Sequence, residues 1–118
     1  MPDGPCAAIN DGELAHFNGA VRILYRYTWD GVSTRDGANG CTGPVTRLQG
    51  INTTADRTFY AHFKGKRGQP RVITMPPGFN QTYSNRNQIR NMGFDTANDL
   101  EDLQITESSV APANIARR

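Results

Sequence analysis

The sequence predicts an all-β domain, either a small antiparallel β-sandwich or a Greek-key barrel, with extended polar N- and C-terminal arms. A chain of 118 residues fits one domain with one modest core. Only 36% of the residues are apolar, and twelve glycines and seven prolines mark many turns. The apolar residues form short runs instead of helical stripes, so we expect about six to eight short strands. The expected parts are an N-terminal arm (residues 1–13), one β-domain (14–106) and a C-terminal arm (107–118).

The clearest strand covers residues 21–29, where every second side chain is apolar or aromatic. The turn signal Asp30-Gly31 ends it, and a polar, glycine-rich loop over residues 33–44 follows. The next strand, residues 45–51, is shorter. It needs a β-bulge if Val45 and Leu48 are to share one face.

Three further strands are expected before the C-terminal part of the domain. They cover residues 57–63, 71–75 and 79–83, with a hairpin loop at 65–68. Residues 84–93 are polar, and we expect them to be irregular, with Ile89 and Met92 as anchors.

The segment from Asp95 to Leu103 fits a short helix that Asp95 or Thr96 would cap, with Asp99 near its positive end. The competing interpretation is a loop that leads into a final strand over residues 103–106. The predicted core combines the apolar positions of these elements: Val21, Ile23, Tyr25, Tyr27, Trp29, Phe59, Phe63, Val72, Ile73, Phe79, Leu103 and Ile105.

A pentapeptide occurs twice. Ala15-His16-Phe17-Asn18-Gly19 recurs 46 residues later as Ala61-His62-Phe63-Lys64-Gly65, and the two copies contain both histidines of the chain. A repeat with this period suggests two similar supersecondary units within one domain.

The two cysteines, Cys6 and Cys41, are disulfide candidates. A bridge would tie the N-terminus to the domain and would indicate an oxidising compartment. The first residues have neither a charged n-region nor an apolar h-region. We therefore expect either a chain that acts in a cytosol or one whose signal was removed. No run approaches the ~20 apolar residues of a membrane helix.

Charge is segregated along the chain. Between Arg57 and Phe94 there are seven basic residues and no acidic one, whereas residues 95–107 contain five acids and no base. Such opposed segments favour contacts with a charged partner or a second copy, although two solvated faces would explain them equally well. The candidate partner-binding residues are Lys64, Lys66, Arg67, Arg71, Arg117 and Arg118. A net charge of +2 does not favour nucleic acid as that partner.

The sequence offers no catalytic set and no cofactor-binding loop, so we expect a protein that is not an enzyme and needs no cofactor. His16 and His62 could approach each other, but no spaced Cys, His or Glu supplies further metal ligands. The only dense acidic cluster contains Asp99 and Asp102, which are candidates for a weak calcium site. A solvated turn is the alternative interpretation of that cluster.

The repeat period and the two Phe-x-Gly units resemble the βγ-crystallin family. The resemblance implies two paired Greek-key motifs, and secreted relatives that inhibit proteases or bind calcium. Asn98-Asp99-Leu100-Glu101-Asp102 is similar to the calcium motif of that family. Asp102 stands where the family has Ser or Thr, and Leu103 stands in place of the final Ser.

In overall character the chain also resembles the small accessory proteins of tailed-phage virions, such as capsid decoration proteins. The shared character is a compact β-domain with polar arms and a surface rich in Thr, Asn and Gly. This resemblance implies a structural protein in a virion that docks on a major structural protein or forms a homo-oligomer. We therefore expect a non-enzymatic docking module on a larger assembly. The alternative is a secreted, crystallin-like inhibitor or calcium-binding module.

Overall fold

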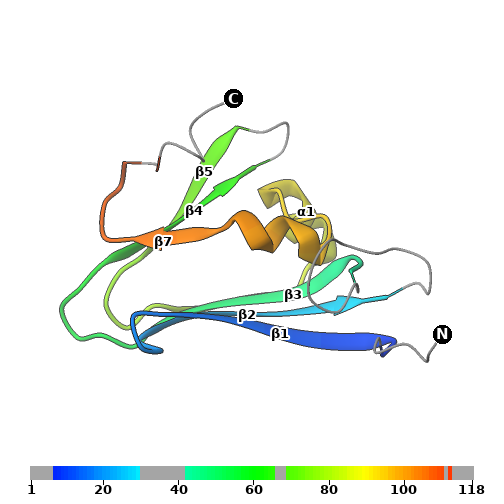
Figure 1. Ribbon diagram of the computed structural model, residues 1–118, viewed down its shortest axis with the longest axis horizontal. Coiled ribbons are helices and arrows are strands. Elements are labelled where there is room, and N and C mark those ends of the chain that lie inside the picture. Colours follow the sequence, from blue (N-terminus) through cyan, green and yellow to red (C-terminus); the bar gives the residue numbers. More distant parts are fainter. Residues whose placement is uncertain (1–6, 30–41, 66–68, 111, 113–118) are drawn as a thin grey trace.

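The computed structural model describes residues 7–29, 42–65, 69–110 and 112, and it contains two antiparallel sheets (Figure 1). The four-stranded sheet has the order β1-β2-β3-β6 and the three-stranded sheet the order β5-β4-β7. The prediction of a small all-β sandwich is confirmed. The strands are β1 (Ile9–His16), β2 (Val21–Thr28), β3 (Val45–Asn52), β4 (Phe59–Lys64), β5 (Pro70–Met75), β6 (Asn80–Tyr83) and β7 (Gln104–Thr106).

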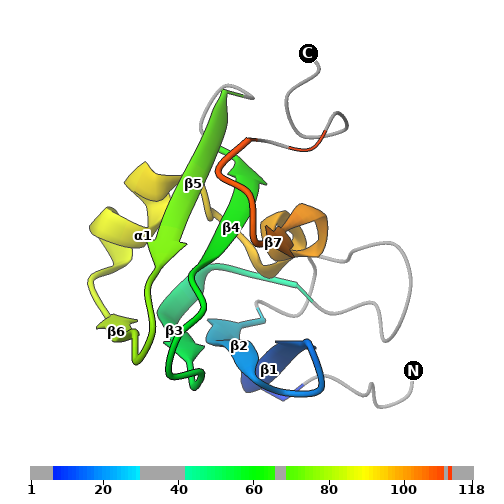
Figure 2. The ribbon, with the colours of Figure 1, turned by 90° about the vertical axis from the view of Figure 1, so that its left-hand side faces the viewer.

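The helices α1 (Arg86–Met92) and η2 (Ala97–Asp102, a 3-10 helix) lie on the same side of the four-stranded sheet as the three-stranded sheet (Figures 1 and 2). The core fills the space between these layers. Of the predicted core residues, seven are buried and four are partly buried. The buried ones are Val21, Ile23, Tyr27, Phe59, Phe63, Leu103 and Ile105, and the partly buried ones are Tyr25, Trp29, Ile73 and Phe79.

Val72 is the one predicted core residue that is wrong, because its side chain is 45% exposed. Neighbouring residues of a strand point to opposite faces. Ile73 packs against the core, so Val72 must face outward from β5. The core also includes residues outside the predicted set, among them Met75, Ile89, Phe94 and Leu100.

The bulge predicted for the strand over residues 45–51, which is β3, is confirmed. Val45 and Leu48 are both buried, and the pairing with β2 shifts between Arg26 and Tyr27. Arg26 pairs with Arg47 and Tyr27 with Val45, so Thr46 is the extra residue. The shift returns both apolar side chains to the inner face.

Residues 84–93 are not irregular, because α1 occupies most of them. The side chain of Asn85 caps the helix by accepting a hydrogen bond from the amide of Gln88, and Gly93 ends it with a positive φ of 125°. Ile89 is fully buried, as expected of an anchor, and Met92 packs at the edge of the core. A polar sequence thus forms a helix through its caps and one buried side chain.

The predicted N-terminal arm is too long, because residues 9–13 form the first part of β1. Gly12 permits this strand to pair, since a Cβ there would lie 2.3 Å from the ring of Tyr25 on β2. The glycine leaves room for a cross-strand aromatic ring.

Both interpretations of residues 95–106 are correct in part, because η2 is followed directly by β7. Asp99 lies in the first turn of η2, and its Oδ2 accepts hydrogen bonds from the amides of Asp95 and Thr96. Thr42 and Gly43 hold the start of η2, because the Asn98 amide donates to Thr42 Oγ1 and the Ala97 amide donates to the Gly43 carbonyl. Gly43 also lies so close to β2 that a Cβ would overlap the carbonyl of Thr28.

Several predictions lie outside the described residues: the disulfide candidates, part of the loop at 33–44, and four of the six basic partner-binding candidates. These residues are Cys6, Cys41, Lys66, Arg67, Arg117 and Arg118. None of the helices in the described part of the chain has the length and hydropathy of a membrane-crossing segment.

Candidate functional site

The segregated charges pair with each other across the fold. Arg57 Nε lies 2.7 Å from Glu107 Oε2, and Arg86 Nη2 lies 2.8 Å from Asp95 Oδ1. Each pair joins the basic segment to the acidic one. Part of the charge pattern that the sequence assigned to a partner therefore acts within the domain.

Lys64 and Arg71, the two described partner-binding candidates, lie near the free end of the β4–β5 hairpin and are exposed. Neither has an ion pair within the described residues. The stem of Arg71 crosses Gly65, where a Cβ would lie 2.3 Å from Cγ of Arg71. The hairpin projects away from the four-stranded sheet (Figure 2). It therefore presents two cations to solvent.

The acidic cluster has a structural role at Asp99, because one carboxylate oxygen already accepts two backbone amides. The backbone of Asp102 belongs to η2. Among the described residues, no group of three acidic, His or Cys side chains could hold a metal ion.

His62 is 1% exposed, and its Nε2 lies 2.8 Å from the carbonyl oxygen of Ser108 and 3.1 Å from Thr106 Oγ1. Since a carbonyl only accepts, Nε2 carries the proton and donates to Ser108. This bond attaches residues 107–110, the start of the predicted C-terminal arm, to the three-stranded sheet. His16, in contrast, lies at the end of β1 and is half-buried, and that burial lowers its pKa.

An exposed aromatic residue stands at the turn between β1 and β2. Phe17 and Asn18 have φ values of 55° and 58°, and the Gly19 amide donates to the carbonyl of His16 at 3.1 Å. Gly19 also has a positive φ (84°), so three successive residues of the four-residue loop between β1 and β2 are in the left-handed region. A bulky residue rarely adopts this conformation, which costs about 1–3 kcal/mol. Phe17 nevertheless leaves 42% of its surface in solvent.

The ring of Phe17 is fixed by neighbours from distant parts of the chain. Its centroid lies 4.7 Å from that of Phe59, which is fully buried at the start of β4. The guanidinium carbon of Arg57 lies 5.8 Å from the Phe17 centroid and 5.0 Å from the Phe59 centroid. Both distances fit cation–π contacts. We call Phe17, Arg57, Phe59 and Glu107 the tip cluster.

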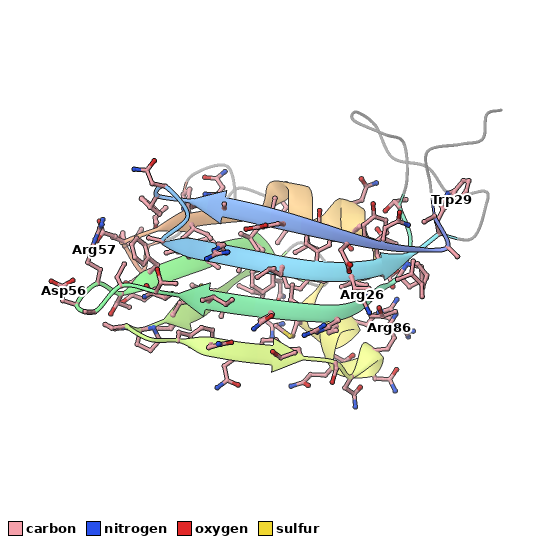
Figure 3. All side chains as sticks on the ribbon, turned by 90° about the horizontal axis from the view of Figure 1, so that it is seen from below. Arg26, Trp29, Asp56, Arg57 and Arg86 are labelled. Atoms are coloured by element: carbon pink, nitrogen blue, oxygen red, sulfur yellow. The ribbon has the colours of Figure 1, made fainter. Side chains whose placement is uncertain are left out.

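Arg57 is held in turn by Glu107, whose carboxylate accepts a hydrogen bond from Nε of Arg57. That hydrogen bond lowers the pKa of Glu107 and raises the pKa of Arg57. Both side chains stay about half exposed. Figure 3 shows Arg57 at the end of the molecule where the β1–β2 turn lies.

A buried amide shapes the backbone beneath the tip cluster. Asn52 is 1% exposed, and its Nδ2 donates to the carbonyls of Arg57 (2.8 Å) and Met75 (2.9 Å). Its Oδ1 accepts from both the amide and the hydroxyl of Thr54. All four hydrogen-bonding positions of the amide are therefore used. Thr53 extends the support, because its amide and hydroxyl both donate to the carbonyl of Ala20 beside the turn.

None of the site residues predicted from the sequence belongs to the tip cluster. Its members come from the repeat, the start of the basic segment and the end of the acidic one, which meet only in the fold. A usable signal was present, since Phe17 directly precedes Asn18-Gly19, a dipeptide that favours hairpin turns. An aromatic side chain beside such a turn is a candidate for exposure.

Comparison with protein-family models, with curated proteins and with solved structures finds no match to this chain.

Proposed function

We propose that the protein is a non-enzymatic docking module that attaches to a larger protein assembly through the tip cluster. The observation that carries this proposal is the exposed ring of Phe17, kept in a strained turn and backed by Arg57 and Phe59. Strain of this kind persists only where the surrounding structure enforces it, and it gathers at functional positions.

The chemistry of the cluster fits a protein partner. Aromatic and arginine side chains are enriched among the residues that dominate protein–protein binding energy. Phe17 and Arg57 are also held in place before binding, by Phe59 and by Glu107. Such preorganisation reduces the conformational entropy that association would otherwise cost.

Lys64 and Arg71 would form a second, electrostatic contact at the β4–β5 hairpin. Exposed charges of this kind mainly speed association and select partners, and add little affinity. A virion accessory protein of the capsid decoration type is the assembly role that we favour, with a major structural protein as the partner.

The proposal is tested by comparing variants for association with the assembly recovered from the source cells, measured by co-sedimentation of the tagged chain. Phe17→Ala should weaken association about 30-fold or more, the loss of about 2 kcal/mol typical of a dominant contact. Arg57→Ala should weaken it less. Ile9→Ala is the matched control, because Ile9 is an exposed apolar residue at the start of β1, away from the turn that follows the other end of this strand. If folded Phe17→Ala protein associates as well as the unmodified chain, the proposal fails.

A further inference from the structure

The outer face of the four-stranded sheet is left uncovered by the described elements. The three-stranded sheet and both helices lie on its other side (Figures 1 and 3). Strand alternation and register put one set of side chains on the open face of β1, β2 and β3. They include Asp11, Arg26 and Arg47 in one row, and Glu13, Leu24 and Gln49 in the next.

This face contains a hollow of about 250 Å³. Its side-chain lining includes Asp11, Arg26, Arg47 and Gln49, with the half-buried side chain of Leu24 among them. The first three follow one another across the sheet, since Asp11 pairs with Arg26 and Arg26 with Arg47. Leu24 pairs with Gln49 in the next row. The hollow therefore has an apolar floor and a polar, mainly cationic rim.

The charges on this rim are not balanced. Arg26 and Arg47 stand directly opposite each other on neighbouring strands, an arrangement that is destabilising for like charges. Asp11 accepts hydrogen bonds from Nε (2.8 Å) and Nη2 (3.3 Å) of Arg26. No carboxylate in the described part of the chain forms an ion pair with Arg47. The hydrogen bond with Arg26 lowers the pKa of Asp11 and Arg47 adds to this effect, but Asp11 forms its hydrogen bonds with Arg26, so the Arg47 guanidinium can still receive an anion.

The size of the hollow limits what that anion can be. Pockets for drug-sized ligands and cofactors span roughly 300–1,000 Å³, so this one suits a single side chain or a small ion. Leu24 favours a ligand with a short apolar stem. Asp11 disfavours a dianion such as phosphate, because it places a negative charge on the same rim. The amide of Gln49 donates to Asn80 Oδ1 at 2.9 Å and has a second N–H to offer.

We propose that Arg47, with Arg26 and Gln49 above Leu24, forms a binding site for one carboxylate group on a short aliphatic stem, such as a glutamate side chain of a protein. The site lies on a different surface from the tip cluster, toward the other end of the sheet (Figure 3). It therefore does not depend on the function proposed for Phe17.

The test is a titration of the isotope-labelled protein with sodium propionate, the carboxylate and stem of glutamate. The titration is monitored by two-dimensional NMR at pH 7 and constant ionic strength. Arg47 Nε–H and the amides of residues 24–26 and 47–49 should shift and saturate together. Arg47→Gln should weaken binding about tenfold or more, because charge-assisted hydrogen bonds are lost. Asp11→Asn should tighten binding by about threefold, because a competing exposed charge is removed.

Two controls separate this site from general surface effects. Arg90→Gln removes an exposed cation from α1, and Phe17→Ala alters the tip cluster; both should leave the titration unchanged. Absence of saturable shifts, saturation that survives Arg47→Gln, or weaker binding in Asp11→Asn would each overturn the proposal. Phosphate that binds more tightly than propionate would overturn the assignment to a carboxylate.

Discussion

The two copies of the repeated pentapeptide have opposite structural roles. Each copy lies at the end of the first strand of a hairpin, β1–β2 or β4–β5. In the first copy the strand ends at His16 and Phe17 enters the turn, with 42% of its surface exposed. In the second copy the strand continues to Lys64, and Phe63 is 2% exposed.

The two copies differ at their fourth residue, Asn18 in the turn and Lys64 in the strand, and they also differ in the neighbours that each phenylalanine meets. Phe63 meets Phe94 in the core, with ring centroids 4.4 Å apart. Phe17 contacts Phe59 of the core and Arg57, but its own ring stays partly in solvent. One copy therefore contributes a phenylalanine to the core, and the other leaves its phenylalanine exposed.

The largest expected contrast is between the two phenylalanines. Phe63→Ala should lower the free energy of unfolding by about 3–5 kcal/mol, because it opens a cavity in the core. Phe17→Ala should cost at most about 1 kcal/mol, because its ring is half exposed, whereas the strain of the positive φ remains because alanine keeps the Cβ. Urea unfolding measures both. Equal losses would mean that Phe17 is a core residue, and the two copies would then not have opposite structural roles.

The histidines should also differ, with the larger loss of stability at His62 in the second copy. His62→Ala removes one of the two donors to the carbonyl of Ser108, leaving the Thr106 hydroxyl, and it empties a buried site, so we expect a loss of about 2–3 kcal/mol. His16→Ala should cost less than about 1 kcal/mol, since its ring is only half-buried. Thermal and urea unfolding of both variants provide the measurement, and similar losses would remove the distinction.

The glycines that end the two copies should be sensitive for different reasons. Gly19 has a φ of 84° and open space around it, so Gly19→Ala should cost about 1–2 kcal/mol through the backbone alone. Gly65 lies under Arg71, and Gly65→Ala should cost about 1 kcal/mol through that clash. Combining Arg71→Ala with Gly65→Ala should remove most of the cost of the Gly65 substitution, whereas combining it with Gly19→Ala should leave the cost of the Gly19 substitution unchanged. If the losses of unfolding free energy are additive in the Gly65–Arg71 double variant as well, this explanation is contradicted.

The smallest effect concerns pH and distinguishes His16 from a solvated histidine. Burial lowers the pKa of His16 in the folded state from its usual 6.5. Between the lowered value and 6.5 the unfolded chain binds more protons, so stability should rise with pH across that window. His16→Gln should remove this part of the slope. The measurement is the free energy of unfolding of both proteins from pH 5 to pH 7.5. If its slope against pH is the same with and without His16→Gln, the burial of His16 has no such effect.

The fold was predictable where apolar and polar side chains alternate strongly and where apolar side chains have to face the core. Residues 21–29 and the bulge between Val45 and Leu48 follow from the pattern of side chains. Strand β1 was not predictable, because Asn10, Asp11 and Gly12 are poor strand formers and β1 depends on pairing with β2. Val72 and Ile73 are adjacent apolar residues, and only the position of the core decides which one is buried.

The candidate site was less accessible to sequence reasoning than the fold. Phe17, Arg57 and Glu107 are distant in sequence, and although Asn18-Gly19 indicates the turn, it does not indicate which residues the Phe17 ring contacts. Charge segregation was visible, but its partial neutralisation by Arg57–Glu107 and Arg86–Asp95 needed the three-dimensional contacts. Long-range juxtaposition, not local propensity, makes this site.

Site-specific photo-cross-linking tests the docking role of Phe17 most directly. A benzophenone-bearing analogue of phenylalanine would replace Phe17 in one variant and exposed Arg90 in another, and each would be irradiated in the assembly from the source cells. We predict one discrete adduct with a structural protein of that assembly from position 17 and none from position 90. No adduct from position 17, or the same adducts from both positions, would contradict the account.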